Sequence, residues 1–221
     1  MLAELVRRFA PVARGVQADA RSGAFGQLLI DDFGDGRYSN MAIEGRIFST
    51  AIKAVTITAT HNSPIAAATA TPVVGFLNPS GSKRAAVLLR AQLSSVSGTP
   101  AGGQAVLNAV SGVGTSITAA GAGSIFSTLL DAGPSPDGST MVSYNNTALT
   151  GLSPTTGREI VLLGGVSAVA LGSAANPQAE DLGGLVIVPP NTLVAVMAGT
   201  GAGTTWIVNG GLTWAEIDWP V

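Results

Sequence analysis

The 221-residue sequence contains no cysteine and a single histidine, and it is poor in charged and aromatic residues. The absence of cysteine excludes disulfides, thiolate metal sites and cysteine nucleophiles. Charged residues make up only 11% of the chain, whereas about 25% is usual in a globular protein. The 11 basic and 13 acidic residues give a net charge of −2 and form no basic stripe. Nucleic-acid binding is therefore not expected.

Long hydrophobic runs are also absent. The most apolar run covers residues 160–171 and is interrupted by Gly164 and Gly165, whereas a membrane-spanning helix needs about 20 residues. Arg7 and Arg8 are not followed by the apolar stretch of a cleavable signal peptide. We expect a protein that is made in the cytoplasm and has no membrane partner.

Residues 1–45 differ in pattern from the rest of the chain and are interpreted as an N-terminal arm. A short helical pattern ends at Pro11 and Gly15, and a segment rich in Gly and Asp follows. Such a segment cannot bury much by itself, so its apolar residues are expected to dock on the chain's own domain or on a neighbour. The candidate interface residues of the arm are Leu5, Phe9, Phe25, Leu29, Phe33 and Tyr38.

Residues 46–221 are predicted to form one antiparallel β-sandwich domain. Short β-branched runs recur here at intervals of about 8–15 residues, separated by Gly, Pro or Asn. A jelly roll is favoured over an immunoglobulin fold, because the Cys–Trp–Cys core of the latter is impossible without cysteine. Residues 192–198 and 204–219, joined by a Gly-rich turn, are interpreted as a terminal hairpin.

Catalytic and cofactor motifs are not evident. His61 lies beside an Asn-Ser-Pro turn with no Gly-x-Ser-x-Gly motif in the chain, so a surface or interface role is favoured over a catalytic one. The acidic residues 31–36 lack a ligand where Phe33 stands and the following Glu of a calcium loop. The Gly-rich stretches 112–114 and 199–203 are followed by β-like sequence, whereas a phosphate loop requires a helix there. The sequence therefore predicts a non-enzymatic protein without a cofactor or a metal.

The three tryptophans, Trp206, Trp214 and Trp219, all lie near the C-terminus. Trp214 and Glu216 are expected on one face of a strand, because side chains alternate along it. Clustered aromatic residues could form a sugar-binding platform, but we favour tryptophans that close the sandwich or pack against a neighbouring subunit. They complete the set of candidate interface residues.

Two turn motifs and a terminal strand carry a resemblance to a known group of proteins. Residues 76–83 read Phe-Leu-Asn-Pro-Ser-Gly-Ser-Lys and lead into a strand, and Ser-Gly-Thr-Pro follows at 97–100. Val-Pro-Pro-Asn-Thr stands at 188–192, and Leu-Thr-Trp-Ala-Glu at 212–216. This combination resembles small β-sandwich structural proteins of tailed-phage virions, over residues 70–221.

The resemblance implies a virion component, a decoration or cement protein that bridges and stabilises major capsid subunits. The expected partners are the major capsid protein, other virion proteins and further copies of the chain, with a trimer suggested by analogy. Alternative expectations are a tail, baseplate or head-fibre subunit, or a carbohydrate-binding module that uses the C-terminal tryptophans.

Overall fold

The structure is a computed structural model that describes residues 38, 41–42, 44–57, 69–100, 102–113, 123–128, 138–152, 157–166, 177–200 and 205–219. The chain divides into two units, Met1–Ile43 and Glu44–Val221. In the first unit, the N–H of Ala42 donates to the carbonyl of Tyr38 at 2.9 Å. The predicted arm falls mainly outside the described residues, and its boundary at residue 45 stays a prediction.

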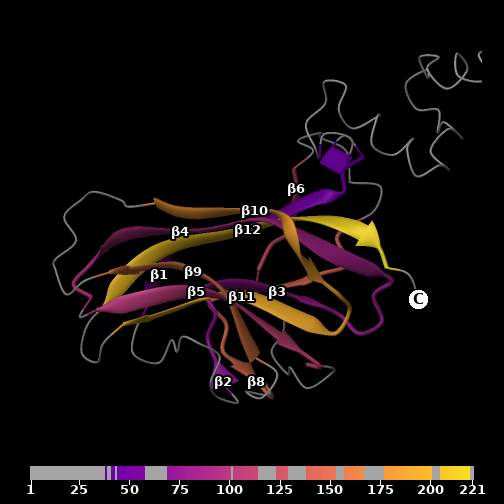
Figure 1. The fold of residues 1–221 in the computed structure, drawn as a ribbon. Helices are drawn as coiled ribbons and strands as arrows, with labels where there is room; N and C mark the ends of the chain where they lie inside the picture. The colour runs from indigo at the N-terminus through magenta and orange to yellow at the C-terminus, as the bar shows by residue number, and fades with distance from the viewer. Residues whose placement is uncertain are drawn as a thin grey trace, which may run out of the picture. The chain divides into compact units, whose positions relative to one another are not determined.

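The second unit consists of two five-stranded antiparallel sheets packed face to face (Figure 1). The first sheet has the order β10-β4-β12-β1-β6, and the second has the order β7-β3-β11-β5-β9. A small additional sheet pairs β2 with β8. The strands are β1 Ile47–Ile57, β2 Thr69–Ala70, β3 Val74–Asn78, β4 Arg84–Gly98, β5 Gly103–Ser111, β6 Phe126–Ser127, β7 Val142–Asn145, β8 Leu149–Thr150, β9 Gly157–Val166, β10 Pro177–Val188, β11 Thr192–Thr200 and β12 Trp206–Asp218.

The strand order is that of a jelly roll. Without the short strands β2, β6, β7 and β8, eight strands remain, and the sheets read β10-β4-β12-β1 and β3-β11-β5-β9. Two interlocked Greek keys generate this order. The predicted all-β, antiparallel, jelly-roll sandwich is confirmed.

The predicted terminal hairpin is wrong. β11 pairs with β3 and β5 in the second sheet, whereas β12 pairs with β1 and β4 in the first. A Gly-rich connection suits a crossing from one sheet to the other as well as a tight turn, so the sequence signal is the same for both.

The main core lies between the two sheets. Side chains alternate between the two faces of β11, and those of Val194, Val196 and Ala198 face this core. Phe76 of β3 and Trp214 of β12 stack across it with ring centroids 4.4 Å apart. Burial of these apolar side chains is the main favourable contribution to folding.

A second, smaller core covers the outer face of the second sheet. The other face of β11 contributes Leu193, Ala195 and Met197 to it, and Leu149 and Leu152 pack above them. β11 is therefore buried on both faces, which explains its continuous apolar sequence. Tyr144 of β7 belongs to this second core, and burial raises the pKa of its phenol.

The two turn motifs behind the resemblance meet in the fold. Asn78 ends β3 and is fully buried, and its Nδ2 donates to the carbonyl of Arg84 at 2.9 Å and to that of Val188 at 3.0 Å. The backbone carbonyl of Asn78 accepts from the N–H of Asn191 at 2.8 Å. Asn191 has a φ of 66° after Pro190, as the third position of a type II turn requires. Asn78 thus fastens the end of β3 to the start of β4, the end of β10 and the turn before β11.

Replacement of the Asn78 side chain is expected to destabilise the domain measurably. Asn78→Ala leaves the buried carbonyl of Val188 without its amide donor, whereas the carbonyl of Arg84 still accepts from Ser82 Oγ at 3.2 Å, so a loss of about 1–3 kcal/mol in the free energy of unfolding is expected. Equilibrium urea unfolding measures it, and Ser80→Ala, at an exposed position of the same turn, is the control. A loss below about 0.5 kcal/mol for Asn78→Ala, the range of ordinary surface substitutions, would contradict this role.

Candidate functional site

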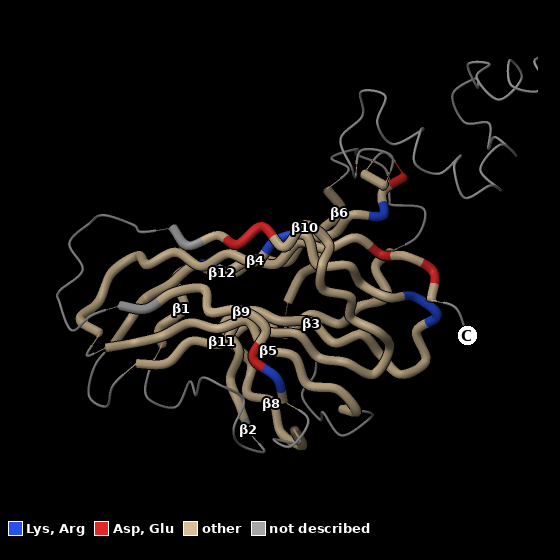
Figure 2. Tube along the Cα trace, in the orientation of Figure 1, with Lys and Arg blue, Asp and Glu red and all other residues tan. Residues whose placement is uncertain are grey.

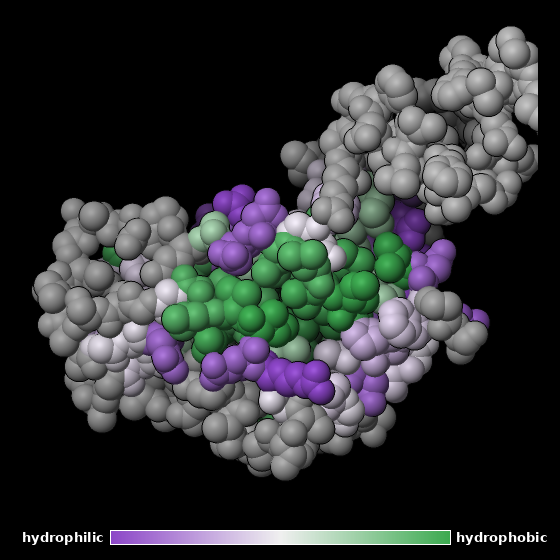
Figure 3. Space-filling view, viewed as in Figure 1, coloured by the Kyte–Doolittle hydropathy of each residue, from purple (hydrophilic) through white to green (hydrophobic). Residues whose placement is uncertain are grey.

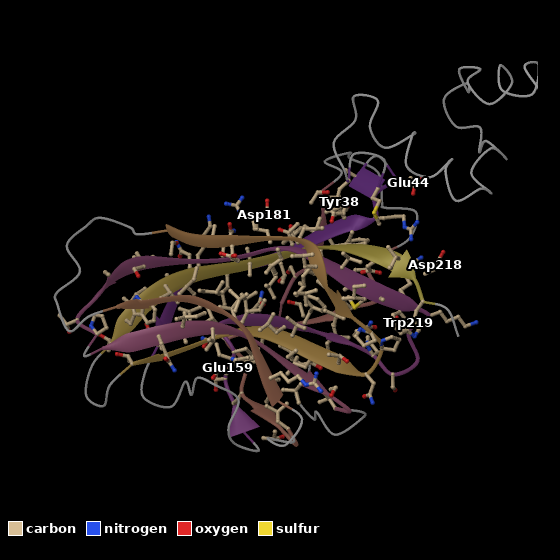
Figure 4. The ribbon with its side chains drawn as sticks, in the orientation of Figure 1. Tyr38, Glu44, Glu159, Asp181, Asp218 and Trp219 are labelled. Atoms are coloured by element: carbon tan, nitrogen blue, oxygen red, sulfur yellow. The ribbon has the colours of Figure 1, made fainter. Side chains whose placement is uncertain are left out.

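The structure places four of the nine candidate interface residues. Leu5, Phe9, Phe25, Leu29 and Phe33 lie outside the described residues, as do His61 and residues 31–36. Tyr38 is half-buried. Trp206 and Trp214 are fully buried, and Trp219, just beyond the end of β12, is 36% exposed (Figure 4). The prediction that these residues contact a partner stays a prediction.

The two buried tryptophans are engaged within their own domain. Trp214 packs against Phe76 and lies 6.3 Å from Phe48, measured between ring centroids. The indole N–H of Trp206 donates to Ser95 Oγ at 3.0 Å. A sugar platform needs ring faces open to solvent, and neither ring offers one.

The most elaborate polar cluster surrounds the carboxylate of Glu216, which is fully buried beside Trp214. The two side chains share one face of β12, as predicted from strand alternation, and Trp214 Nε1 donates to Glu216 Oε1 at 3.3 Å. Ser139 Oγ donates to the same oxygen. Glu216 Oε2 accepts from Thr140 N at 3.3 Å and Thr140 Oγ1 at 3.2 Å, and it lies 3.4 Å from Arg84 Nη1.

This arrangement saturates the carboxylate. An ionised carboxylate offers about four lone-pair positions, and five donors converge on Glu216. The same residue exchanges two further bonds through its backbone, from its N–H to the carbonyl of Arg46 at 2.9 Å and from Arg46 Nε to its carbonyl at 3.0 Å. Glu216 therefore joins residues 139–140 and Arg84 to β12. A carboxylate held in this way is poorly placed to act as a general base, although Ser139 is within reach.

A surface hollow of about 380 Å³ lies next to this cluster. Its lining combines apolar side chains with hydroxyl groups and comprises Phe48, Gly123, Ile125, Ser127, Gly138, Ser139, Met141, Val142 and Ser143. Thr50 Oγ1 and Ser143 Oγ lie 2.9 Å apart, and Asn145 Nδ2 donates to Thr50 Oγ1 at 3.1 Å. These hydroxyl and amide groups bond to one another and hold β1 of the first sheet to β7 of the second.

Metal-ligating side chains do not gather anywhere in the part of the chain that the structure describes. No three His, Cys, Asp or Glu residues among those described lie close enough to hold an ion. In the same residues, the structure contains no helix of the length and hydrophobicity that crossing a membrane requires.

Large apolar side chains are exposed at both edges of the sandwich. On β6, Phe126 is 62% exposed; at the other edge, Leu162 of β9 is 65%, Leu185 of β10 is 86% and Ile187 of β10 is 53% exposed. None of these four residues is among the nine candidate interface residues. A signal was present, because residues 185–188, Leu-Val-Ile-Val, are apolar at every position, whereas an edge strand with one solvated face normally alternates.

Comparisons with protein-family models, with curated proteins and with solved structures found no significant match to this chain.

Proposed function

We propose that this chain is a non-enzymatic structural protein of a tailed-phage virion, a decoration protein that bridges and stabilises major capsid subunits. The observation that carries the proposal is the surface of the sandwich: few Lys, Arg, Asp and Glu residues lie along its strands (Figure 2), and large apolar side chains are exposed at both edges. Charged residues are depleted where an interface core loses its water, and apolar ones are enriched there.

The interior polar groups support a structural role. The carboxylate of Glu216 and the hydroxyls of Thr50 and Ser143 form hydrogen bonds within the domain. The bonds from Thr140 to Glu216 and the bond between Thr50 and Ser143 connect elements that are distant in sequence. They contribute to the rigidity of the sandwich, which suits a protein whose function is to hold other subunits in place.

The mechanism would be thermodynamic linkage. A protein that binds the assembled shell and not its separated subunits stabilises the shell by RT ln(1 + [L]/Kd) per site, where [L] is the concentration of the free protein. Each sandwich would contact two or three capsid subunits and oppose their separation. The fold alone does not specify this role, because jelly rolls occur in capsid proteins, lectins and enzymes; the surface and the two turn motifs supply the argument.

The proposal is tested by co-sedimentation of the purified full chain with expanded capsid shells and, separately, with tails of the phage that carries it. Saturable binding to shells with a fixed stoichiometry is the expected result. Binding to tails alone would contradict the decoration role and assign the same sandwich to a tail or baseplate. Failure to bind either, together with retardation on a polysaccharide gel, would favour the carbohydrate-binding alternative.

A further inference from the structure

The surface hollow of about 380 Å³ is lined from the edge strands of both sheets. Phe48 of β1 contributes to it, together with residues between 123 and 127 that lead into β6, and residues 138–143 that lead into β7. β6 is the edge strand of the first sheet, and β7 is the edge strand of the second. The volume falls in the range of about 300–1,000 Å³ that small-molecule sites occupy.

The apolar part of the lining is continuous with the main core. Phe48 and Met141 are buried members of that core, and Ile125 packs against it. We call these three residues the apolar wall, and they offer a fixed surface on which the C–H groups of a ligand can pack. The apolar face that Figure 3 shows in green, on the side where β9 and β10 run, is a separate region, since neither strand contributes to the described lining of the hollow.

The hydroxyl proton of Ser143 is used within the protein. Asn145 Nδ2 donates to Thr50 Oγ1 at 3.1 Å, so the Thr50 hydroxyl turns its own proton toward Ser143 Oγ, 2.9 Å away. Ser143 Oγ in turn donates to Asn145 Oδ1 at 3.2 Å. The three side chains form a closed ring of hydrogen bonds. A hydroxyl oxygen has two lone pairs, so Ser143 Oγ keeps one acceptor position.

The hydroxyl proton of Ser139 is used in the same way. Ser139 Oγ donates to Glu216 Oε1 and accepts from the N–H of Met141 at 3.1 Å, which leaves one acceptor position. The carboxylate of Glu216 is paired with Arg84, whose Nη1 lies 3.4 Å from Oε2. The described lining of the hollow contains no charged residue. Its two serines therefore offer hydrogen-bond acceptors beside an apolar wall.

We propose that the hollow binds one uncharged sugar ring of a glycan. Hydroxyl groups of the ring donate to Ser139 Oγ and Ser143 Oγ, and its C–H face packs on the apolar wall. A pyranose meets both requirements, because hydroxyls project from its rim and C–H groups cover its face. An anionic ligand is excluded, since its oxygens would meet the lone pairs of the two serines with no cation in the described lining to offset the lost hydration.

The first test is a titration of the full chain with the methyl glycosides of glucose, galactose, mannose and N-acetylglucosamine, followed by saturation-transfer NMR. At least one glycoside is expected to bind with a dissociation constant on the order of 1 mM, as befits a ligand of this size. The strongest saturation should fall on the C–H face of the ring. Methyl glucuronoside, which is anionic, and the fully O-methylated form of the bound glycoside, which has no donor, should each bind at least tenfold more weakly.

Gly138→Leu tests the location of the site. A Cβ at Gly138 meets no atom within 4 Å, and the φ of this residue lies outside the left-handed region. Leucine therefore fits there, obstructs the hollow, and should weaken sugar binding at least tenfold without unfolding the chain. Gly81→Leu is the matched control, because a Cβ at this exposed turn position also meets no atom within 4 Å and Gly81 lies outside the described lining. Trp219→Ala should bind like the wild type.

Several results would overturn the proposal. They are the absence of binding by every neutral glycoside at tens of millimolar, a folded Gly138→Leu variant that binds as tightly as the wild type, and loss of binding in a folded Trp219→Ala variant. Tighter binding of methyl glucuronoside or of cyclohexylamine than of any neutral glycoside would assign the hollow to a charged ligand instead. The proposal does not depend on the virion role. Shell binding is measured separately, so a sugar-binding protein that ignores shells would refute the decoration role and leave this proposal standing.

Discussion

Glu216→Ala is expected to lower the free energy of unfolding by about 3–5 kcal/mol. The substitution removes the carboxylate that accepts from Trp214 Nε1, Ser139 Oγ and both Thr140 donors. It also leaves the partly buried guanidinium of Arg84 without its counter-charge. The loss is a large part of the stability of an ordinary domain, about 5–15 kcal/mol, and equilibrium urea unfolding measures it.

Two variants separate the charge of Glu216 from its shape and its position. Glu216→Gln keeps the volume and one acceptor oxygen, so its cost should lie between that of the alanine variant and zero. Asp218→Ala removes an exposed carboxylate two residues further along β12, and it should change the free energy of unfolding by less than about 0.5 kcal/mol. An alanine variant at position 216 that is as stable as Asp218→Ala would refute the anchoring role.

Trp214→Ala is expected to lower the free energy of unfolding by about 3–5 kcal/mol, because it opens a cavity at the centre of the main core. Phe76 loses its stacked partner, Phe48 loses its tilted one, and Glu216 loses the indole donor. Trp206 remains as the fluorescent reporter of unfolding, since it is buried on the same strand.

Trp219→Ala is the matched control for this experiment and also tests the carbohydrate alternative. This ring is partly exposed, so its removal should leave the stability nearly unchanged. If the protein binds polysaccharide and Trp219→Ala abolishes that binding without unfolding the chain, the result would support the carbohydrate-binding alternative with Trp219 as the aromatic contact. A Trp214→Ala variant that unfolds at the wild-type urea concentration would show that the ring is not part of the core.

Local sequence patterns predicted the fold well, because strand residues and turn residues differ in chemistry. The alternating pattern after Lys83 predicts a strand over residues 84–96, which is β4, Arg84–Gly98, and the strand expected at 192–198 is β11, Thr192–Thr200. For β10 the β-like pattern covers only residues 184–188, so it predicts less than half of the strand Pro177–Val188. Its first half contains Glu180, Asp181 and two glycines in a bulge, and this composition resembles a loop. The assignment of β11 and β12 to opposite sheets depends on pairing between distant segments, which no local pattern encodes.

The polar cluster was only partly predictable. Alternation placed Trp214 and Glu216 on one face, but it could not show that the face points into the core or that residues 139–140 supply donors. Apart from Trp214, the partners of the Glu216 carboxylate come from positions more than 70 residues away. The sequence signal for this cluster was the single carboxylate of Glu216 between the apolar residues Ala215 and Ile217. The apolar run at 185–188 was the corresponding signal for the exposed edge.

The measurement that tests the central claim most directly is the temperature at which expanded capsid shells disrupt, recorded by calorimetry with increasing amounts of the full chain. The decoration role predicts that this temperature rises as the sites fill and continues to rise with the logarithm of the free protein concentration. A disruption temperature that stays constant while the shells are saturated with the protein, or in the absence of any binding, would contradict it.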